Sequence, residues 1–435
     1  MTALDPALLA RLDALVRERT GDDRLADMFG VCLRNTIERT ARVLDDGSTF
    51  VITGDIPAMW LRDSTLQFHP YLLFIAEDRT LRELVTGLVQ RQAELIIHDP
   101  YANAFNVEPN GATWDPDDLC DDPLVWEQKY EVDSLALPIL LAHRVWRILD
   151  SPEHLSERVH RAFATVVEVW IREQHHDARS TYRFVRHNDH PGDTLVREGR
   201  GPEHAVTGMT WAGFRPSDDA CTFSFNIPGN LLAAHTLDLL GELAIRVWRD
   251  DELSARAAVL AAEIRAGVAA HGIVEHPKYG TIFAYEVDGL GGVNLMDDAN
   301  VPSLLSLSWL GAVPADDPVL QATRRFVLSE DNPYYFRGPA AAGVGSPHTP
   351  DRYVWPIALA VEGLTCGSKE RREEILTTLR NTDAGTSMMH EGFDVDDPTR
   401  FTREWFSWAN AMFCELVLAH CGLNVARLTG DAADV

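Results

Sequence analysis

Apolar residues recur at helical spacing along most of the chain, whereas the alternation typical of half-buried strands is confined to a few short places. The spacing predicts helices over residues 7–18, 25–44, from Trp60 onward, 80–98, 132–149, 152–174, 220–240, 253–271, 301–310, 317–329, 352–365, 369–380 and 402–420. A long acidic loop is expected over 99–128. The short run from Thr181 to Arg186, with a polar sequel to Thr207, predicts a small surface hairpin.

The predicted helices are of two kinds that alternate along the chain. One kind follows a Gly-, Pro- or Asp-rich loop and becomes apolar on all sides. These helices begin near Trp60, Glu131, Ala220, Asn300, Tyr353 and Arg403. The helices between them are charged and apolar on one face only. Because helices of the first kind must be buried and those of the second must lie outside, the pattern predicts an all-α fold: a closed (α/α)6 barrel with the small hairpin inserted. No Pro-, Ser- or Gly-rich linker divides the chain, so we expect one domain over 1–435.

Composition and net charge limit which classes of protein and which binding partners are compatible with this chain. The 435 residues are 46% hydrophobic and 24% charged, and the formal charge of −27 argues against nucleic acid or an anionic membrane as a partner. No apolar run approaches the roughly 18 residues of a membrane span, and we recognise no signal peptide. The six cysteines lack CxxC spacing, which favours free thiols and a cytoplasmic protein over a disulfide framework.

The stretch from Phe50 to Leu72 is the first that suggests chemistry. Arg62 and Asp63 fall in the first turn of a predicted helix, beside Trp60. A carboxylate and a guanidinium can hold vicinal sugar hydroxyls by charge-assisted hydrogen bonds, and an indole offers an apolar face. The alternative is that Asp63 complements the helix N-terminus while Arg62 is a solvated surface residue.

A second stretch, from Thr207 to Asn230, places two adjacent carboxyls between a Pro-Ser turn and an apolar helix. Asp218 and Asp219 could serve only as an N-cap and a first-turn acid. However, Trp211, Phe214 and Arg215 precede them, and one cap does not require such a loop. An acid held against aromatic side chains has its charged form disfavoured, which suits a general acid.

A third stretch runs from Asn381 to Asn410. Glu391 lies in a loop too polar for a core and too rich in Met, Phe and Trp for a linker, so it is a candidate general base. A metal site at His390-Glu391 is weakly supported, because there is no HExxH and no partner histidine at helical spacing. Trp405 and two nearby aromatics could stack on sugar rings or pack in the core.

Two further loops contain residues that could bind a ligand. Glycines and prolines between Arg337 and Trp355 would hold His348 on a rigid loop, and the Gly-Val-Gly there lacks the strand and third glycine of a nucleotide site. The acidic loop from Asp115 to Asp122 lacks the glycine and glutamate of an EF-hand. We interpret it as a solvated loop and leave open whether it binds a cation.

These blocks together resemble glycoside hydrolase family 125. The matching runs are T-G-D-I-P-A-M-W-L-R-D-S, G-F-R-P-S-D-D-A, G-S-P-H-T-P with Y-V-W-P, and M-H-E-G-F, in that order between Thr53 and Asn410. The resemblance implies an exo-acting α-1,6-mannosidase on an (α/α)6 barrel, working with inversion and without a metal or other cofactor. It implies a general acid at Asp218, with Asp219 as the alternative, and a general base at Glu391.

The resemblance also implies a set of substrate contacts for a mannose-containing oligosaccharide or glycan. Sugar-contacting roles fall on Arg62, Asp63, Arg215 and His348. Trp60 or Trp405 would supply an apolar platform, and Asp219 and His390 are further candidates. For inversion the two catalytic carboxyls should lie about 6.5–9.5 Å apart, leaving room for a water.

Two other functions remain open at this point. One is a sugar epimerase or isomerase on the same barrel, in which histidines carry the protons. The other is a non-catalytic carbohydrate-binding protein. The sequence leaves open the natural substrate, the aglycone preference and the oligomeric state.

Overall fold

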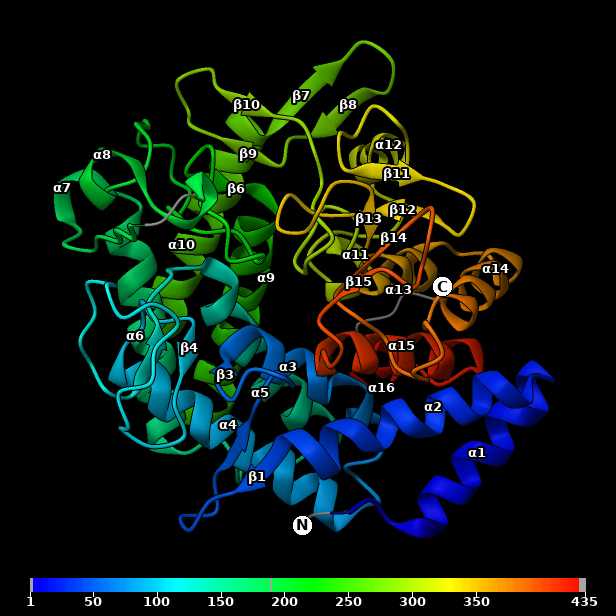
Figure 1. Cartoon of the computed structure of the whole chain (residues 1–435). Coiled ribbons are helices and arrows are strands. Elements are labelled where there is room, and N and C mark those ends of the chain that lie inside the picture. The colour runs from blue at the N-terminus through cyan, green and yellow to red at the C-terminus, as the bar shows by residue number, and fades with distance from the viewer. Residues whose placement is uncertain (1–2, 188–189, 430–435) are drawn as a thin grey trace.

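The computed structural model describes residues 3–187 and 190–429, and helices dominate it (Figure 1). The predicted inner helices are α3 (Leu61–Phe68), α5 (Val132–Leu149), α9 (Ile227–Leu243), α11 (Leu307–Leu310), α13 (Pro356–Thr365) and α15 (Ser407–His420). The predicted outer ones are α2 (Asp23–Asn35), α4 (Arg79–His98), α6 (Glu157–Glu173), α10 (Asp251–Gly267), α12 (Pro318–Val327) and α14 (Lys369–Asn381). The additional helices are α1 (Pro6–Thr20), α7 (His176–Arg179), α8 (Val196–Gly199) and α16 (Val425–Thr429).

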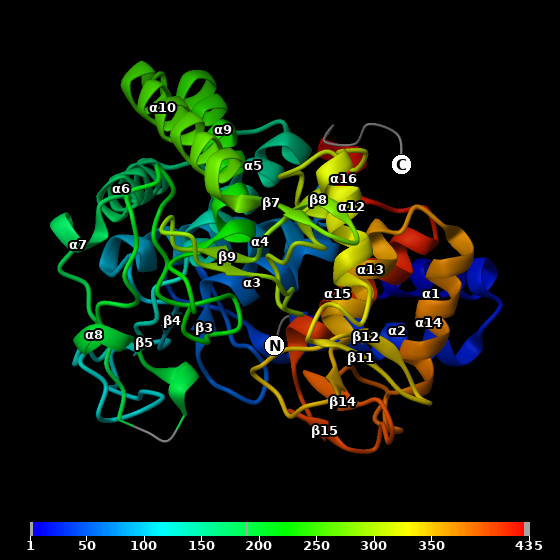
Figure 2. The same ribbon diagram turned by 90° about the horizontal axis from the view of Figure 1, so that it is seen from above.

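The inner helices contact one another in a closed cycle. The α3 helix packs on α5, α5 on α9, α9 on α11, α11 on α13, α13 on α15, and α15 returns to α3. Seen from above, α3, α13 and α15 lie between α6 on the left and α14 on the right (Figure 2). The alternation of helix types along the sequence is therefore matched by alternation between the middle and the periphery of the molecule.

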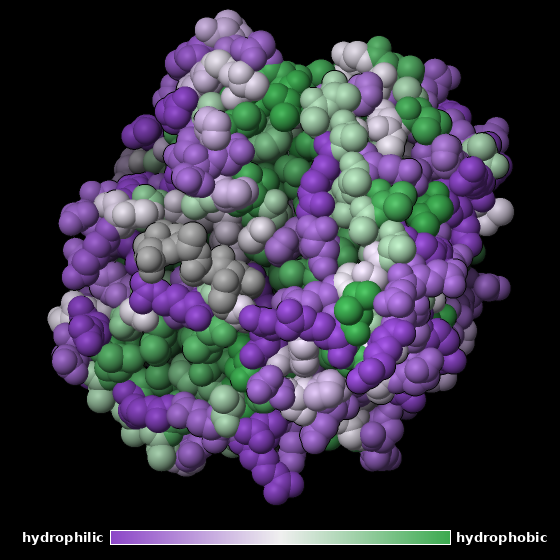
Figure 3. Space-filling model, turned by 180° about the vertical axis from the view of Figure 1, so that it is seen from behind, coloured by the Kyte–Doolittle hydropathy of each residue, from purple (hydrophilic) through white to green (hydrophobic). Residues whose placement is uncertain are grey.

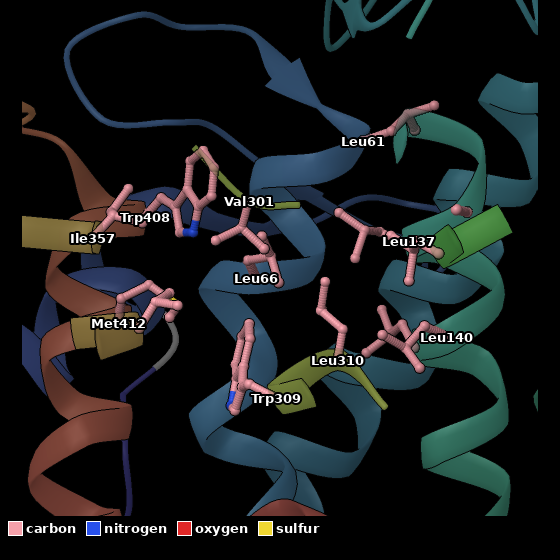
Figure 4. Packing of buried hydrophobic residues seen from close by; sticks show 14 of the residues in the cluster. Leu61, Leu66, Leu137, Leu140, Val301, Trp309, Leu310, Ile357, Trp408 and Met412 are labelled. Carbon is pink, nitrogen blue, oxygen red and sulfur yellow. The ribbon is translucent and has the colours of Figure 1, made fainter. Parts of the chain in front are cut away.

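Burial explains why the two kinds of helix take these places. Every residue from 356 to 363 in α13 and from 407 to 418 in α15 is buried, so these helices need neighbours on all sides. The outer α6 instead buries one face, which includes Val159, Phe163 and Trp170. Side chains from α3, α5, α11, α13 and α15 meet in the middle of the molecule, among them Leu66, Leu137, Leu310, Ile357 and Met412 (Figure 4).

Short strands accompany the helices, so the expectation of an all-α fold is corrected. The strands are β1 (Ala41–Val43), β2 (Thr49–Val51), β3 (Met59–Trp60), β4 (Ala104–Phe105), β5 (Val125–Glu127), β6 (Phe225–Asn226), β7 (Ile273–His276), β8 (Gly280–Phe283), β9 (Glu286–Val287), β10 (Val293–Asn294), β11 (Tyr335–Arg337), β12 (Ala342–Val344), β13 (Tyr353–Val354), β14 (Gly392–Asp394) and β15 (Phe401–Thr402). They pair antiparallel in small sheets. Most are two or three residues long, too short for alternation to be recognised.

Three of these sheets form the approach to inner helices. The strand β3 ends at Trp60, where α3 begins; β6 leads directly into α9; and β13 leads into α13. The orders are β3-β4-β5, β10-β9-β6 and β13-β14-β15, with Val354 opposite Phe393 and Phe393 opposite Phe401. The predicted starts of α9, α13 and α15 were therefore four to seven residues too early, because an extended segment precedes each helix. Pro356 is the first residue of α13 and Pro228 the second of α9, both in the first turn, where proline is tolerated.

The first and last inner helices are joined by a backbone contact. The amide of Asp55 donates to the Trp405 carbonyl at 3.1 Å, and the amide of Ser407 donates to the Thr53 carbonyl at 2.9 Å. Gly54 lies between them at φ 137°, and a Cβ there would be 2.3 Å from the Trp405 oxygen. Only glycine allows this approach, which brings the loop before α3 against the loop before α15.

The predicted surface hairpin over 181–207 is wrong for the described residues of that segment. They contain no strand; a 3-10 turn (Pro191–Asp193) and α8 lie there instead. Tyr182, Phe184 and Arg186 are buried, and Tyr182 stacks on Tyr101 with ring centroids 5.1 Å apart. The aromatic residues that suggested a strand are thus used to seat this segment on the body. Two-stranded hairpins occur instead at β1–β2, β7–β8 and β11–β12.

Hydrophilic side chains cover much of the face seen in Figure 3, interrupted by apolar areas. This agrees with the high net charge of the sequence. No helix among the described residues is long and apolar enough to cross a membrane.

Candidate active site

A cavity of about 910 Å³ opens where the loops before the inner helices meet. Trp60, Arg62 and Asp63 come from the start of α3, and Lys129 from the approach to α5. The loop before α9 contributes residues 215–222, and the remaining walls include Asn300, His348, Trp355, Glu391, Arg403, Phe406 and Trp408. The volume is in the range of small-molecule sites. Segments from the whole length of the chain thus converge on one hollow.

Asp218 and Asp219 lie on a tight turn and not on a helix cap. The amide of Asp218 donates to the Arg215 carbonyl at 2.9 Å, and the amide of Arg215 donates to the Asp219 carbonyl at 2.8 Å. Asp218 has a left-handed φ of 65°, which is uncommon for a residue with a Cβ. The cap of α9 is Asn226. The capping alternative for the two aspartates is therefore excluded, and a strained conformation of this kind is typical of functional sites.

The Asp218 carboxylate is held from one side. Its Oδ1 atom accepts from Arg62 Nη2 at 3.0 Å and from Asn103 Nδ2 at 3.2 Å. Burial is the largest single influence and raises the pKa of Asp218, but Arg62, Glu131, Lys129 and His348 together lower it, and the pKa lies below its usual value. The Oδ2 atom receives no hydrogen bond from the described N–H and O–H donors.

Arg62 is surrounded by acids and is not the solvated residue of the alternative interpretation. Its Nη1 lies 2.6 Å from Glu131 Oε2 and 3.1 Å from Asp133 Oδ2, in addition to the contact with Asp218. Its Nε is 3.5 Å from Asp63 Oδ2. Only 3% of the arginine is exposed. The Arg62 guanidinium is thus bound by carboxyls of the protein. A sugar hydroxyl that contacts Arg62, as predicted, would have to share N–H groups with those carboxyls.

Asp63 borders the cavity with an unused acceptor. Its Oδ2 is buried and has no hydrogen-bond partner among the described residues. Burial raises the pKa of Asp63 to about 6, although Arg62 opposes the shift. A buried polar atom without a partner is costly, so a ligand hydroxyl in the cavity would relieve it.

Glu391 faces the cavity from the start of β14. The residue is 7% exposed, and Arg403 Nη1 lies 3.8 Å from its Oε1, too far for a hydrogen bond but near enough for charge attraction. No described donor hydrogen-bonds to its side chain. The carboxylate is therefore free to accept a proton from a water in the cavity.

His348 is paired with Asp219 at the cavity wall. Its Nδ1 lies 3.2 Å from Asp219 Oδ1, and Ser217 Oγ donates to Asp219 Oδ2 at 3.1 Å. The His348 side chain is 37% exposed, and its partial removal from water favours the neutral ring, but the charge of Asp219, with Glu391 and Asp218 beyond it, raises the pKa of His348 to about 10. The ring is accordingly a cation at neutral pH.

We expect the His348 ring to titrate near pH 10 in NMR spectra of the histidine-labelled protein, with assignment by loss of the signal in His348→Gln. Because this pKa is raised above the ordinary 6.5, the stability from the pair is complete below pH 6.5 and is lost as the pH rises through 10. Asp219→Asn should bring the titration back toward 6.5. Titration of the wild-type ring near 6.5 would contradict the pairing.

Two residues predicted to contact the substrate, His390 and Trp405, lie outside the lining of this cavity. Neither is among the described residues that line the cavity. The His390 ring stacks on Phe401 at 3.7 Å, and Trp405 Nε1 donates to Asn35 Oδ1 at 2.8 Å. Their neighbours Glu391 and Phe406 line the cavity instead. The other predicted site residues border it: Trp60, Arg62, Asp63, Arg215, Asp218, Asp219, His348 and Glu391.

Comparison with known proteins decides the family. A family model described as metal-independent alpha-mannosidase (GH125) matches residues 22–418. The chain belongs to glycoside hydrolase family 125. The resemblance seen in the sequence is thereby confirmed, and with it the assignment as an α-mannosidase-type glycoside hydrolase.

Relatives of this family 125 chain include one solved structure of high similarity. It is a Streptococcus pneumoniae protein of a family of metal-independent alpha mannosidases, in a non-productive complex with α-1,6-mannobiose. It is 46% identical, with a TM-score of 0.95, and covers 98% of this chain and 100% of its own. The meiotically up-regulated gene 157 protein of Schizosaccharomyces pombe is 40% identical over 93% of this chain and 83% of its own length. A bacterial glucoamylase complexed with acarbose shares the fold, with 13% identity, a TM-score of 0.60 and coverage of 95% and 57%.

The acidic loop of the family 125 chain is less solvated than expected. Arg186 binds both carboxylate oxygens of Asp118, at 2.8 and 2.6 Å, and also reaches Glu127 and Asp193. The loop is therefore seated on the buried Arg186. Within residues 3–187 and 190–429, no group of three or more His, Cys, Asp or Glu side chains could hold a metal ion.

Several residues of the site were missed by sequence reasoning. They are Asn103, Glu131, Asp133, Glu286 and Arg403. Arg215, a predicted sugar contact, forms two hydrogen bonds to the buried Glu286 and presents its remaining surface to the cavity. The start of the α5 helix near Glu131 was recognised from the sequence, but its two acids were not, because nothing local shows that they face Arg62.

Proposed function

We propose that this chain is an exo-acting α-1,6-mannosidase that hydrolyses terminal non-reducing mannose with inversion. The observation that carries the proposal is the placement of Asp218 and Glu391, from distant parts of the sequence, on one cavity. The mannobiose complex of the Streptococcus pneumoniae relative supports the substrate. The closed cycle of inner helices supports an (α/α)6 barrel in a single domain. The cytoplasmic location stays a prediction.

Asp218 is the general acid in this mechanism. Its Oδ1 is occupied by Arg62 and Asn103, which leaves Oδ2 to carry the proton toward the glycosidic oxygen. Asp219 is the weaker candidate because both its oxygens are engaged, one by the protonated His348 and one by Ser217. Proton transfer from Asp218 to the oxygen accompanies cleavage of its bond to the anomeric carbon, and the leaving sugar departs as an alcohol.

Glu391 is the general base. A water between Glu391 and the sugar attacks the anomeric carbon on the face opposite the leaving group. Its proton passes to the carboxylate and its oxygen forms the new bond, so the configuration inverts. Arg403, 3.8 Å away, attracts the Glu391 carboxylate without blocking it by a hydrogen bond. A separation of about 6.5–9.5 Å between the two carboxyls leaves room for the water.

The terminal mannose is oriented by polar groups of the cavity wall. The unpartnered Asp63 Oδ2 accepts from a hydroxyl, and the His348 cation and Arg215 donate. Trp60 supplies an apolar face at the same wall. Groups fixed by buried ion pairs position the ring before reaction, which lowers the entropic part of the barrier.

The deciding experiment is proton NMR of an α-1,6-mannobiose digest at early times. We expect β-mannose to be the first product signal, followed by mutarotation to the mixture. First appearance of α-mannose would refute inversion. Interconversion of sugars without hydrolysis would favour an epimerase, and binding without any product would favour a non-catalytic carbohydrate-binding protein.

A further inference from the structure

Four carboxyl groups surround Arg62, and if all were ionised they would carry more negative charge than the arginine can neutralise. Asp63, Glu131, Asp133 and Asp218 all lie within 3.5 Å of the guanidinium, and each is buried or mostly so. The other cations that act on these carboxyls already have acidic partners: Lys129 is paired with Asp193, His348 with Asp219, and Arg403 with Asp55. Four buried carboxyls cannot all ionise when Arg62 is the one cation that they do not share with other acids, so the group holds at least one proton at neutral pH.

The position of Glu131 indicates where that proton lies. Its Oε2 accepts from Arg62 at 2.6 Å and from Ser134 Oγ at 2.8 Å. Its Oε1 is buried, and no N–H or O–H donor of the described residues reaches it. Asp218 binds Nη2 of the guanidinium whose Nη1 binds Glu131, so the two carboxyls lie side by side and interact directly. Two carboxyls can form a hydrogen bond only if one of them is protonated.

The electrostatics place the resting proton on Glu131. Burial raises the pKa of Glu131 well above its ordinary value, while Arg62 holds the pKa of Asp218 below its own. Such a pair titrates as a unit, and the proton can occupy either member. This resolves a difficulty of the proposed mechanism, in which Asp218 must donate a proton although Arg62 favours its ionised form.

We propose that Glu131 and Asp218 share one proton and that Glu131 supplies it to the general acid during bond cleavage. Resting on the proposed function, this makes Glu131 a positioning residue that acts through Asp218. The O–H bond of Glu131 breaks as an O–H bond forms at Asp218, and this same proton then leaves Asp218 for the glycosidic oxygen as its bond to the anomeric carbon breaks. Both carboxyls are then ionised beside Arg62 until solvent returns one proton, which balances the proton that Glu391 took from water and later releases.

The other groups that act on this pair are few and identifiable. Charged or titratable side chains face it from α3, from α5 and its approach, and from the loop before β13. They are Arg62, Asp63, Lys129, Asp133 and His348, and the polar Asn103 and Ser134 complete the shell. Asp63 and Asp133 act on Asp218 through their charge, whereas Glu131 adjoins it directly.

The test compares Glu131→Gln with wild type on two substrates across pH. On α-1,6-mannobiose the variant should lose about 10²–10⁴ in kcat at neutral pH, and the alkaline limb of its pH profile should move to lower pH. On 2,4-dinitrophenyl α-mannoside, whose leaving group needs no protonation, the loss should be much smaller. An unmoved alkaline limb with full activity on mannobiose would overturn the inference.

Two further measurements keep the outcomes distinct. Glu286→Gln, which removes another buried carboxylate beside an arginine of the same site, is the matched control and should leave the alkaline limb in place. Asp218→Asn should show the same dependence on the leaving group as Glu131→Gln. If it does not, the general acid of the proposed function is wrong; if it does while Glu131→Gln behaves as wild type, only the shared proton is refuted.

A measurement on the wild-type enzyme decides the question even if Glu131→Gln fails to fold. In carbon NMR of protein labelled at the glutamate carboxyls, one glutamate should remain protonated at pH 7, and its titration should shift in Asp218→Asn. Ionisation of every glutamate carboxyl at pH 7 would overturn the proposal.

Discussion

Replacing Glu391 with Gln should lower kcat for α-1,6-mannobiose by about 10²–10⁴-fold, with little change in KM. Glutamine keeps the size of the side chain and its place beside Arg403, but it cannot accept a proton from the attacking water. Since no described donor binds the Glu391 carboxylate, its loss leaves no broken hydrogen bond that would distort the cavity. The measurement is steady-state release of mannose, with the fold checked by circular dichroism and thermal unfolding.

The matched control for this change is Glu404→Gln. Glu404 is an exposed residue between β15 and α15, in the segment that follows the β14 strand next to Glu391. It should hydrolyse mannobiose as wild type does. The activated dinitrophenyl substrate should not rescue Glu391→Gln, because an easier departure of the leaving group does not activate water. Retention of most activity in Glu391→Gln would argue for histidine-based proton transfer, and hence for the epimerase.

The fold was predictable from the sequence where helices are long and their burial is uniform. Helices such as α13 and α15, apolar on every side, can be stable only inside, so their place followed from pattern alone. The strands were not predictable, because β3, β6 and β13 have two residues each and are fixed by partners far away in the chain. The helix starts were displaced for the same reason.

In the candidate site, the sequence motifs predicted which residues lie nearby but not which of their side chains point into the cavity. His390 and Glu391 are neighbours just before β14, and Trp405 and Phe406 are neighbours just before α15. Successive residues of extended backbone point to opposite sides. One member of each pair lines the cavity and the other packs behind it. A motif names both residues without telling which one faces inward.

The sequence also could not reveal the acids around Arg62. Glu131 and Asp218 lie far from it along the chain and reach it only because α3, α5 and the loop before α9 adjoin in the ring. Local propensity carries no information on such contacts. The excess of carboxyls over positive charges, and the shared proton inferred from it, can be recognised only in the tertiary structure.

Arg62→Met should destabilise the protein by about 3–5 kcal/mol at neutral pH, the cost of leaving buried charges without their partner. The methionine fills much of the volume beside Trp408, whose ring lies 5.7 Å from the guanidinium, so the loss is mainly electrostatic. Urea unfolding followed by tryptophan fluorescence gives the free energy of unfolding. Arg246→Met is the control: Arg246 is an exposed arginine paired with Glu242, and its loss should change stability by about 0.5 kcal/mol or less.

The pH dependence of this loss separates electrostatics from packing. Arg62 lowers the pKa of Asp63, Glu131, Asp133 and Asp218, so its removal leaves burial to raise all four above their values in the unfolded chain. A carboxyl with a raised folded-state pKa contributes stability below its unfolded pKa and loses it as the pH rises through the folded pKa. The difference between wild type and Arg62→Met should therefore be small near pH 4 and grow toward pH 8. A difference independent of pH would mean that Arg62 stabilises the protein through packing. The inference that the buried carboxyls exceed the positive charge beside them would then have no support from the free energy of unfolding.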